Sequence, residues 1–513
     1  MLVNPRNRFT RQASSSWPLY SAQAAASLDR QVIAAGTPGF ELMQRAARSA
    51  WQLIQQQWPD VRQISVLCGG GNNGGDGLLV ALHAFQAGMK VRLWLAADPL
   101  NYQKEAALAW QAVEQSGLSP QTGAPDAHDL QEDELLVDAL LGIGLKGEVR
   151  GEIKTWIQAI NASKTPVLAL DTPSGLLVDN GQLAGSSVQA AVTLTFIVLK
   201  PGLFTAEGPE YAGEVWLADL GLQGEDFQEQ PLAWLQSCQD ASRALLPRKA
   251  GGHKGDHGRL LILGGQAGMG GAVILAARAA LRTGVGMVKL LTAAENVTAA
   301  LVSQPEIMAA AWPEDKAALD EQLKEAFAWA DALLVGPGLG TDQQAQQICQ
   351  AVGSFEGPVL VDADALNLWA QGWQPPVAEQ RPWVITPHPG EAARLLGWSV
   401  HEVQQQRLKA VNLLALKTGS VALLKGAGSC CAEQGGQALP WVCPFGNPGM
   451  GVAGMGDLLS GCIASLLAQG LEPLVAARLG MRLHAQAGDQ VAADQPRGLL
   501  PSDLLPFLRE GVN

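Results

Sequence analysis

The sequence lacks the patterns that several classes of protein require. It has no C-x-x-C pair and no cluster of cysteine with histidine, so we expect neither a zinc site nor a disulfide framework. No apolar run approaches the ~18 residues needed to span a bilayer, and no basic stretch offsets the formal net charge of -13. Both absences argue against binding to a membrane or, non-specifically, to nucleic acid. The scattered cysteines fit a reducing compartment, so we expect a cytoplasmic protein.

Two further absences exclude one type of phosphate-binding loop and argue against a secretory signal. The chain contains no Gly-Lys dipeptide, which excludes a Walker-type phosphate loop. Residues 1–17 lack the apolar core of a secretory signal. We interpret them as a disordered leader, with an organellar transit peptide as the alternative.

Glycine, by contrast, is abundant. It supplies 58 of 513 residues, which is about 11% against a usual ~7%. The excess falls in short clusters after apolar runs, as in α/β proteins whose strand-to-helix loops approach ligands closely. Because 513 residues exceed the size at which a single core usually stops growing, we expect two domains.

Apolar runs alternate with helix-like stretches in both halves, which predicts two parallel sheets covered on both faces. The first half has expected strands at 64–67, 91–95, 135–137, 167–170 and 192–198, and helices at 21–56, 78–87 and 102–115. The second has expected strands at 259–263, 288–291, 332–335, 359–361, 384–385 and 421–424, and final helices at 458–468, 474–492 and 501–509. Polar residues dominate between 221 and 247, so we place the domains at 1–230 and 231–513.

Three motifs follow predicted strands of the first half. They are GNNGGDG at 71–77, DALLGIGLKGEVRG at 138–151 and DTPSGLLVDNG at 171–181. GNNGGDG predicts a turn whose backbone amides approach a ligand, while Asn72, Asn73 and Asp76 offer oxygens to a cation or to sugar hydroxyls.

The ends of parallel strands converge on one ligand crevice, so residues from the three motifs are expected to meet. We expect one pocket to be shared by Asn73, Asp138, Asp171 and Ser174. The alternative is that each aspartate only caps the turn or helix that follows it.

Together these motifs resemble the NAD(P)H-hydrate epimerase domain, over most of residues 20–225. The likeness implies a Rossmann-like α/β/α domain in which Asp171 transfers protons, because reversible ring opening at carbon 6 needs a group that accepts and returns a proton. It also implies a potassium ion held by Asn73, Asp138 and Ser174. The residues implied to contact the substrate are Asn72, Asn73, Gly74, Gly75, Asp76, Gly142, Ile143, Gly144, Leu145, Lys146, Gly147, Glu148 and Asp171.

In the second half, NPGMGVAGMGDLLSG at 447–461 places Asp457 behind glycines at the predicted start of a helix. Helix N-terminal amides attract phosphate, so a phosphate-handling catalytic base is the first hypothesis for Asp457. Five other pieces are expected at strand ends: HKGDHG at 253–258, GGQAGMGGA at 264–272, VGPGLG at 335–340, TPHPGE at 386–391 and LKGAG at 424–428. Taken singly, His388 could be a turn residue and Lys425 a surface charge, but their joint occurrence favours a site.

This set resembles the NAD(P)H-hydrate dehydratase domain of the ribokinase-like superfamily, an α/β/α fold, across roughly residues 240–510. With both halves matched, the chain resembles the bifunctional NAD(P)H-hydrate repair enzymes. The resemblance implies that ADP, or ATP in eukaryotes, phosphorylates the added hydroxyl before elimination, with Asp457 as the base and the amides of 454–456 steadying the charge. Magnesium is expected on the phosphates.

The resemblance also assigns binding roles in this half. The residues implied to face the hydrate are Ala272, Gly338, His388 and Asp457. Those implied to face the adenine nucleotide are Lys425, Gly426, Ala427, Gly428, Ser429 and Gly456.

Two other functions compete with this interpretation. One is a ribokinase-like vitamin kinase fused to a non-catalytic nucleotide-binding domain, since Gly-x-Gly-Asp alone is shared among such kinases. The other is a scaffold, which the retention of Asn73, Asp138 and Asp171 argues against. We expect a homo-oligomer, because closed homo-oligomers are common among soluble enzymes.

Overall fold

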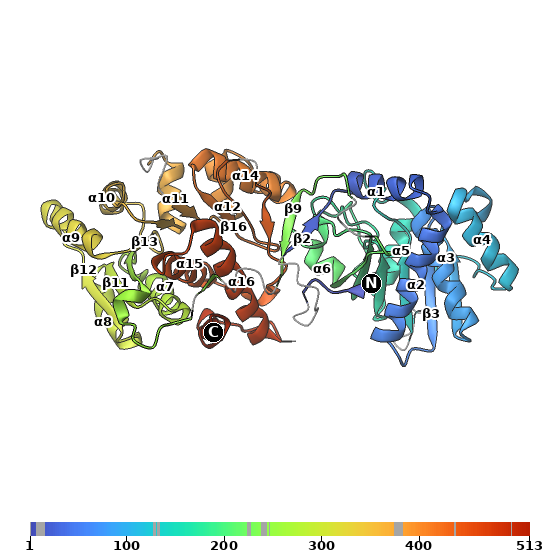
Figure 1. Cartoon of the computed structure of the whole chain (residues 1–513), viewed down its shortest axis with the longest axis horizontal. Helices are drawn as coiled ribbons and strands as arrows, with labels where there is room; N and C mark the ends of the chain where they lie inside the picture. The colour runs from blue at the N-terminus through green and yellow to red at the C-terminus, as the bar shows by residue number, and fades with distance from the viewer. Residues whose placement is uncertain are drawn as a thin grey trace. The chain divides into compact units, whose positions relative to one another are not determined.

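The computed structural model describes residues 2–6, 16–126, 130, 134–222, 227–237, 244–245, 247–373, 383–435, 438–493 and 495–513. The chain divides into two compact units, Met1–Trp234 and Leu235–Asn513, each of which is an α/β structure (Figure 1). The predicted fold class of both halves is confirmed. Among the described helices, none combines the length and apolarity that crossing a bilayer demands. Cys238 lies outside the described residues.

The first unit is built around one sheet with the order β1-β8-β7-β6-β5-β3-β4. Its strands are β1 (Leu2–Val3), β3 (Gln63–Cys68), β4 (Lys90–Leu95), β5 (Leu135–Ala139), β6 (Val167–Leu170), β7 (Val192–Phe196) and β8 (Glu214–Ala218), and β2 (Ser16–Leu19) precedes the first helix. Its helices are α1 (Ala22–Ala34), α2 (Gly39–Gln57), α3 (Asn72–Gln86), α4 (Lys104–Ser116), α5 (Gly151–Ala162) and α6 (Gly208–Ala212).

The strand order creates a switch point beside β3. β3 pairs in parallel with β4 on one side and with β5 on the other, and the parallel pairing continues through β6, β7 and β8. At such a point the loops after two neighbouring strands leave in opposite directions and open a crevice at the carboxyl ends of the strands. The ligand site of this unit is therefore expected at the ends of β3 and β5.

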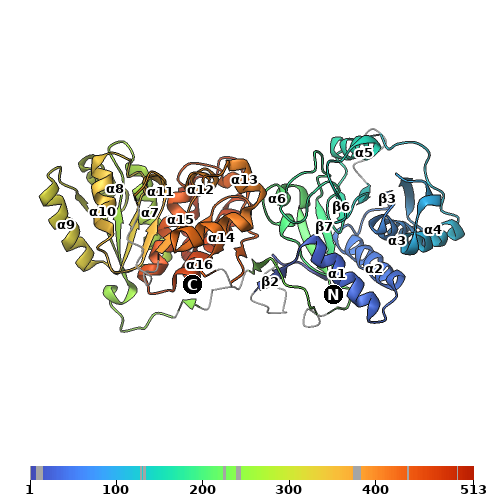
Figure 2. The same ribbon diagram turned by 90° about the horizontal axis from the view of Figure 1, so that it is seen from above.

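Side chains that alternate along the strands bury both faces of this sheet. In β5, Leu135 and Val137 belong to a core cluster that includes residues of α2, α3 and α4. Helix α3 packs against both α2 and α4 (Figures 1 and 2). Leu136 points to the opposite face, where it packs with Trp156 and Ile157 of α5. The sheet is thus the middle of three layers, as the continuous apolar strands predict.

Two predictions for the first half are wrong. GNNGGDG is not a turn, because α3 already begins at Asn72 with Gly71 as its N-cap. The leader is not without structure where it is described, because Leu2 and Val3 pair antiparallel with Ala218 and Leu217 at the edge of the sheet.

The second unit has a sheet in which β12-β11-β10-β13-β14-β15-β16-β17-β18 follow one another. These strands are β10 (Arg259–Leu263), β11 (Met287–Thr292), β12 (Ile307–Ala311), β13 (Ala332–Val335), β14 (Val359–Val361), β15 (Trp383–Ile385), β16 (Val421–Leu424), β17 (Cys430–Ala432) and β18 (Trp441–Val442), and β9 (Ala233–Gln236) spans the division between the units. The helices are α7 (Gly270–Thr283), α8 (Ala294–Ser303), α9 (Lys316–Trp329), α10 (Gln343–Val352), α11 (Ala363–Ala370), α12 (Pro389–Leu396), α13 (Val400–Gln405), α14 (Arg407–Thr418), α15 (Met455–Ala468), α16 (Pro473–Ala492) and α17 (Leu505–Gly511).

Helix α15 is buried almost throughout and lies against α7 and α16, as Figure 2 shows for α16. The approach to α7 depends on Gly461, since a Cβ there would lie 2.0 Å from the carbonyl oxygen of Ala276. This close packing fixes the N-terminus of α15, and with it Asp457, above the carboxyl ends of the parallel strands β10 and β13 to β16.

One predicted site motif lies at the wrong edge of the sheet. HKGDHG (253–258) comes before β10 rather than after it, so it lies at the amino ends of the parallel strands. There a Cβ on Gly258 would be 2.1 Å from the carbonyl oxygen of Ala468, the last residue of α15. The motif is a packing turn beneath the helix and is excluded from the site at the opposite edge.

Candidate active sites

A cavity of about 730 Å³ opens at the ends of β3 and β5 in the first unit. The predicted substrate residues that line it are Asn72, Asn73, Asp76, Gly142, Ile143, Gly144, Leu145, Lys146 and Asp171. Gly74 and Gly75 are buried inside α3 instead, and Glu148 forms an exposed ion pair with Arg150 at 3.3 Å. Gly147 is also outside the lining. The volume suits a ligand of the size of a nucleotide.

Asp171, which follows β6, is held by a buried lysine that the sequence analysis missed. The Nζ atom of Lys200 lies 2.6 Å from Asp171 Oδ1, and the lysine side chain is 1% exposed. The same oxygen accepts a hydrogen bond from the backbone of Phe196 at 3.2 Å. Asp171 adopts φ 63°, a conformation that costs free energy in a residue other than glycine and is often found at functional sites. Its carboxylate is therefore fixed in the cavity and does not cap its own turn.

Three more carboxylates surround Asp171. Asp76 and Asp29 line the cavity with Glu105. Burial, then the charges of Asp171 and Asp29, raises the pKa of Asp76 well above its usual range. Burial, then Glu105 and Asp171, also raises the pKa of Asp29. The cavity therefore combines a carboxylate paired with Lys200 and two acids, Asp76 and Asp29, whose pKa values are raised.

The three residues predicted to hold potassium are joined by hydrogen bonds. Ser174 Oγ donates to Asp138 Oδ1 at 2.6 Å and accepts from the backbone of Leu141 at 2.8 Å. Asn73 Nδ2 donates to the carbonyl oxygen of the same Leu141 at 3.2 Å. Asn73 Oδ1 is buried and has no hydrogen-bond partner. Burial raises the pKa of Asp138 to about 6, although bonds from Ser174 and Leu140 oppose the shift.

The N-terminus of α3 also faces the cavity, because Gly70, Gly71 and Asn72 line it. The first amides of a helix have no partner within it and attract anions. This end of the cavity can bind phosphate groups, while the acids near Lys200 lie where proton transfer could occur.

In the second unit, Asp457 lies in the first turn of α15, whose N-cap Gly454 adopts φ 93°. The predicted position of Asp457 at a helix start is confirmed, although the helix begins at Met455. Burial, together with the carboxylates of Asp362 and Asp364, raises the pKa of Asp457 to about 6, and Lys425 opposes the shift. A carboxylate with such a pKa can accept a proton near neutral pH.

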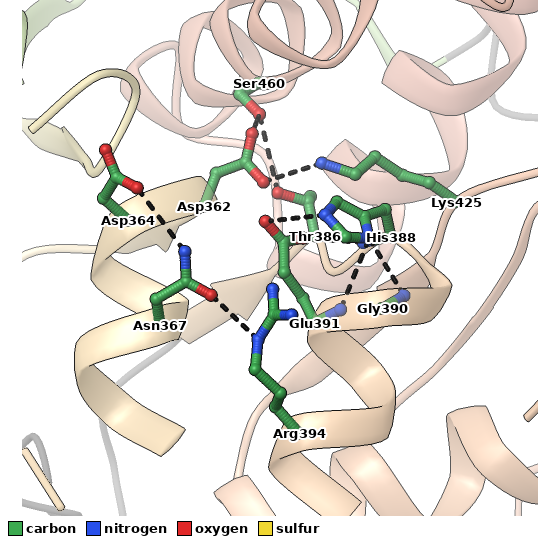
Figure 3. A network of polar contacts seen from close by, with 10 residues as sticks. All are labelled: Asp362, Asp364, Asn367, Thr386, His388, Gly390, Glu391, Arg394, Lys425 and Ser460. Carbon is green, nitrogen blue, oxygen red and sulfur yellow. Dashed lines mark hydrogen bonds and ion pairs between the residues drawn. The ribbon is translucent and has the colours of Figure 1, made fainter. Parts of the chain in front are cut away.

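Lys425, which follows β16, is an internal cation rather than a surface charge. Its Nζ lies 2.8 Å from Asp362 Oδ1, and Ser460 Oγ donates to Asp362 Oδ2 at 2.6 Å (Figure 3). A Cβ on Gly456 would lie 3.3 Å from Lys425 Nζ, so the absence of a side chain there lets the ammonium reach the start of α15. Burial lowers the pKa of Lys425, but Asp362 and Glu391 outweigh it and raise the pKa overall.

His388 is a turn residue, and it also belongs to the charged centre formed by Asp457, Lys425 and Asp362. It is the N-cap of α12, where its Nδ1 accepts from the backbone of Gly390 at 2.9 Å. Glu391 returns the bond, since the His388 backbone donates to its Oε2 at 2.7 Å. The other carboxylate oxygen of Glu391 lies 3.4 Å from His388 Nε2 (Figure 3). Burial and Lys425 lower the pKa of His388, which favours the neutral ring. Because Nδ1 accepts hydrogen bonds, the proton of the neutral ring lies on Nε2. Burial raises the pKa of Glu391 to about 7, with Asp362 adding to the shift and Lys425 opposing it.

Ala272 and Gly338 are brought together at the switch point between β10 and β13. Gly338 adopts φ 56°, and a Cβ there would lie 3.4 Å from the Cβ of Ala272. The backbone of Gly340 donates to Asp364 Oδ2 at 2.9 Å, which ties this loop to the start of α11. The charge of Asp364 also acts on the pKa of Asp457, so this loop is tied to a residue near Asp457.

The residues predicted to face the nucleotide form one loop between β16 and β17. Its start is fixed by a hydrogen bond from the backbone of Lys425 to the carbonyl oxygen of Pro387 at 2.9 Å. Gly426 and Gly428 adopt φ 125° and 62°. These conformations require glycine and turn successive peptide groups in different directions.

Sequence reasoning missed several residues of these centres. Lys200 and Asp362 carried a signal, because each is a charged residue directly after an apolar strand or run, in the same position as Asp171. Arg407, which is 3% exposed and contacts the loop after β16, carried none, because it starts a helix that is distant in sequence from that loop. Asp29 was hidden in the amphipathic pattern of α1.

Two family models match the chain, one in each unit. The model described as the N-terminus of YjeF-related proteins matches residues 39–202. The model described as NAD(P)H-hydrate dehydratase matches residues 260–509.

Relatives match nearly the whole chain. A bifunctional NAD(P)H-hydrate repair enzyme from Coxiella burnetii is 41% identical over 502 residues, which cover 96% of this chain and 99% of the relative. One from Escherichia coli is 41% identical over 478 residues, which cover 92% and 90%. Among solved structures, an ADP/ATP-dependent NAD(P)H-hydrate dehydratase from Bacillus subtilis, co-crystallised with ATP and Mg²⁺, has a TM-score of 0.47 and 27% identity, and the match covers 54% of this chain and 96% of that chain.

Proposed function

Because this chain belongs to the family of bifunctional NAD(P)H-hydrate repair enzymes, we propose that the cavity of its first unit is the epimerase site and the charged centre of its second unit the dehydratase site. The enzyme interconverts the R and S forms of NAD(P)H-hydrate and dehydrates the S form to NAD(P)H at the expense of ADP or ATP. The observation that supports this division most strongly is that each unit carries its own centre at the carboxyl ends of its own parallel strands.

In the epimerase site, Asp171 is the group that transfers protons. The hydroxyl that opens the ring at carbon 6 must lose a proton, and the same proton must return when the ring closes on the other face. Lys200 fixes the position of the Asp171 carboxylate through its contact of 2.6 Å. The amides at the start of α3 and the loop that contains Gly142 to Lys146 bind the nucleotide part of the substrate. Gly147 and Glu148 extend this loop toward solvent.

The oxygens near Asp138 fit a potassium ion. Potassium is bound by oxygen ligands, and Asn73 Oδ1 is a buried oxygen without a partner beside the carbonyl of Leu141, which Asn73 and Ser174 both contact. We therefore assign the ion to Asn73, Asp138 and Ser174. When bound, it would fix the loop after β5 that lines the cavity.

Removing potassium tests this assignment. Dialysis into a buffer with tetramethylammonium as the only monovalent cation should slow epimerisation, because the loop after β5 loses a fixed point. The loss should be smaller than that caused by Asp171→Asn, and dehydration of pure S hydrate should not change. Equal loss of both activities would contradict a potassium site confined to the first unit.

In the dehydratase site, Asp457 removes the proton of the added hydroxyl as it attacks the terminal phosphoryl group of the nucleotide. The bond between carbon 6 and the ester oxygen then breaks, inorganic phosphate leaves, and carbon 5 loses a proton, which restores the double bond of NAD(P)H. Lys425 and the amides of 454–456 stabilise the negative charge that develops. His388, with Ala272 and Gly338, borders the hydrate, while the residues from Gly426 to Ser429 and Gly456 border the nucleotide.

Magnesium is expected to neutralise charge on the nucleotide phosphates. Such a site is built from one or two carboxylates together with phosphate oxygens and water. Asp362 and Asp364, whose charges both act on the pKa of Asp457, are two carboxylates that fit that preference.

Dependence on nucleotide separates this function from its rivals. In a mixed pool of R and S hydrate without nucleotide, the enzyme should bring the two forms to equilibrium without loss of their sum. On addition of ADP or ATP, both forms should disappear and NAD(P)H should accumulate. A vitamin kinase with a non-catalytic first unit would leave both forms unchanged. Identity of 41% across both halves also favours the repair enzyme.

We also propose that the enzyme works in the cytoplasm as a homo-oligomer. In the described part of the chain, the cysteines Cys68, Cys349, Cys430, Cys431, Cys443 and Cys462 are free and buried, which suits a reducing compartment. Size-exclusion chromatography with light scattering would measure the number of subunits.

A further inference from the structure

We propose that Arg407 is a positioning residue for the adenine nucleotide, because its guanidinium group holds the carbonyls of the loop from Lys425 to Ser429 so that the N–H groups of the loop face the phosphates. This inference rests on the proposed role of that loop in nucleotide binding. It adds a residue that touches neither reactant.

Arg407 contacts both the beginning and the end of the loop. Its Nη2 donates to the carbonyl oxygens of Leu424 at 3.3 Å, Lys425 at 3.1 Å and Gly428 at 3.2 Å. Its Nη1 donates to Gln404 Oε1 at 2.6 Å. A planar guanidinium with fixed donors can hold several carbonyls in one geometry, which a lysine cannot do. One side chain therefore sets both ends of the loop.

The loop is shaped to lie on this guanidinium. A Cβ on Gly426 would lie 3.1 Å from Arg407 Nη1, so only glycine lets the backbone approach this closely with φ 125°. Ser429 Oγ donates to the carbonyl oxygen of Gly426 at 2.9 Å. The carbonyls of residues 424, 425, 426 and 428 are thus all engaged within the protein.

The N–H groups of the loop are left for a ligand. Gly426 and Ala427 are exposed, and within the described ranges their backbone N–H groups donate no hydrogen bond to the protein. Successive backbone amides that point the same way from glycine-rich turns form a concave site for anions. With its carbonyls directed inward, this loop presents such a site beside Lys425.

The buried charge of Arg407 also supports its role in nucleotide binding. Arg407 is 3% exposed, and over the residues that the structure covers, no carboxylate forms an ion pair with it. Its Nε is also buried without a partner. Burial lowers the pKa of Arg407, although arginine stays protonated in proteins. A nucleotide phosphate bound on the other side of the loop would supply the missing negative charge.

The test compares three variants of the full chain. Arg407→Met removes the charge and the donors at similar volume, and Arg407→Lys keeps the charge without the planar set of donors. Lys409→Met, at an exposed position on the same helix α14, is the matched loss of charge away from the loop. Steady-state dehydration gives KM for ADP and for S hydrate, and calorimetry gives Kd for ADP and for adenosine.

Arg407→Met should raise KM for ADP by about 10–100-fold, the range expected when hydrogen bonds to a charged group are lost. The turnover at saturating ADP and KM for S hydrate should change by less than about threefold. The Kd of adenosine, which has no phosphate, should stay unchanged. Arg407→Lys should lie between Arg407→Met and the wild type, and Lys409→Met should match the wild type.

An unchanged KM for ADP in both Arg407 variants would overturn the inference, and so would equal weakening of ADP and adenosine. If Arg407→Met does not fold, the comparison of ADP with adenosine in Arg407→Lys decides the matter by the same criterion. Failure of the proposed function is distinguishable, because the wild-type chain itself would then show no nucleotide-dependent loss of S hydrate.

Discussion

Replacing Asp171 by asparagine is expected to slow epimerisation by about 10²–10⁴-fold, the usual contribution of a general acid or base. Asparagine keeps the shape of the side chain but cannot accept a proton. Lys200, which is 1% exposed, also loses its carboxylate partner. Nucleotide-dependent dehydration of pure S hydrate should remain at the wild-type rate, because the second unit has its own centre. Chiral separation of R and S hydrate measures the first rate, and formation of NAD(P)H measures the second.

A folding control accompanies this variant. Loss of one partner of a buried ion pair typically destabilises a protein by about 3–5 kcal/mol, so the thermal unfolding of Asp171→Asn must be compared with that of the wild type. Asp98→Asn is the matched substitution, because Asp98 is an exposed aspartate that follows β4 and lies outside the cavity lining. A loss of less than about tenfold in a folded Asp171→Asn protein would indicate a structural role for Asp171.

Replacing Asp457 by asparagine is expected to lower the turnover of dehydration by about two or more orders of magnitude, while the nucleotide still binds. The loop residues and Lys425 hold the phosphates, and removal of a negative charge beside them can tighten binding. The Kd for ADP should therefore be unchanged or lower. Asp315→Asn, at the exposed N-cap of α9, is the control for a loss of an aspartate at a helix start. If ADP binding collapses in a folded Asp457→Asn protein, Asp457 organises the helix start or a metal and is not the base.

The pH dependence gives a second measure of the same role. The pKa of Asp457 is raised to about 6, and only its ionised form can take a proton. Turnover by the wild type should therefore be lost as the pH falls through about 6 and should level off above about 7. The residual activity of Asp457→Asn should not show this step. A wild-type profile that is flat between about pH 5 and 7 would contradict a role for this carboxylate as the base.

The parts of the fold that could be predicted are those in which local pattern and burial agree. Continuous apolar runs identified β6, β10, β13, β14 and β16 with their observed bounds. The strands that were missed include an exposed strand, β12, and a buried one, β17. β12 is an edge strand with exposed residues, and β17 is three residues long and pairs antiparallel.

The wrong prediction for GNNGGDG has a clear physical cause. Its glycines permit close packing rather than a turn, since a Cβ on Gly74 would lie 1.9 Å from the carbonyl oxygen of Gly69. A Cβ on Gly77 would similarly lie 2.5 Å from the Cβ of Ala139. Tertiary contacts between α3 and the strands therefore outweighed the low helix propensity of glycine. Rules based on local sequence cannot predict such contacts.

Site residues could be predicted where they follow a strand and not where they act across elements. Asp171, Lys425 and Asp457 were found because each ends a strand or begins a helix. The partners that set their properties come from other segments, such as Lys200 on Asp171 and Asp362 on Lys425. The two partners of such a pair are far apart in the sequence. The pair can therefore be identified only once the order of the strands in the sheet is known.

The claim that two separate centres act in sequence is tested most directly by mixing the two variants. Pure R hydrate is incubated with ADP and either variant alone, or with both together, and NAD(P)H is measured. Asp171→Asn alone should leave R hydrate unconverted beyond its spontaneous epimerisation, and Asp457→Asn alone should produce S hydrate without NAD(P)H. The mixture should convert all of the R hydrate to NAD(P)H. A mixture that forms no more NAD(P)H than Asp171→Asn alone, or Asp457→Asn that forms NAD(P)H by itself, would contradict the account.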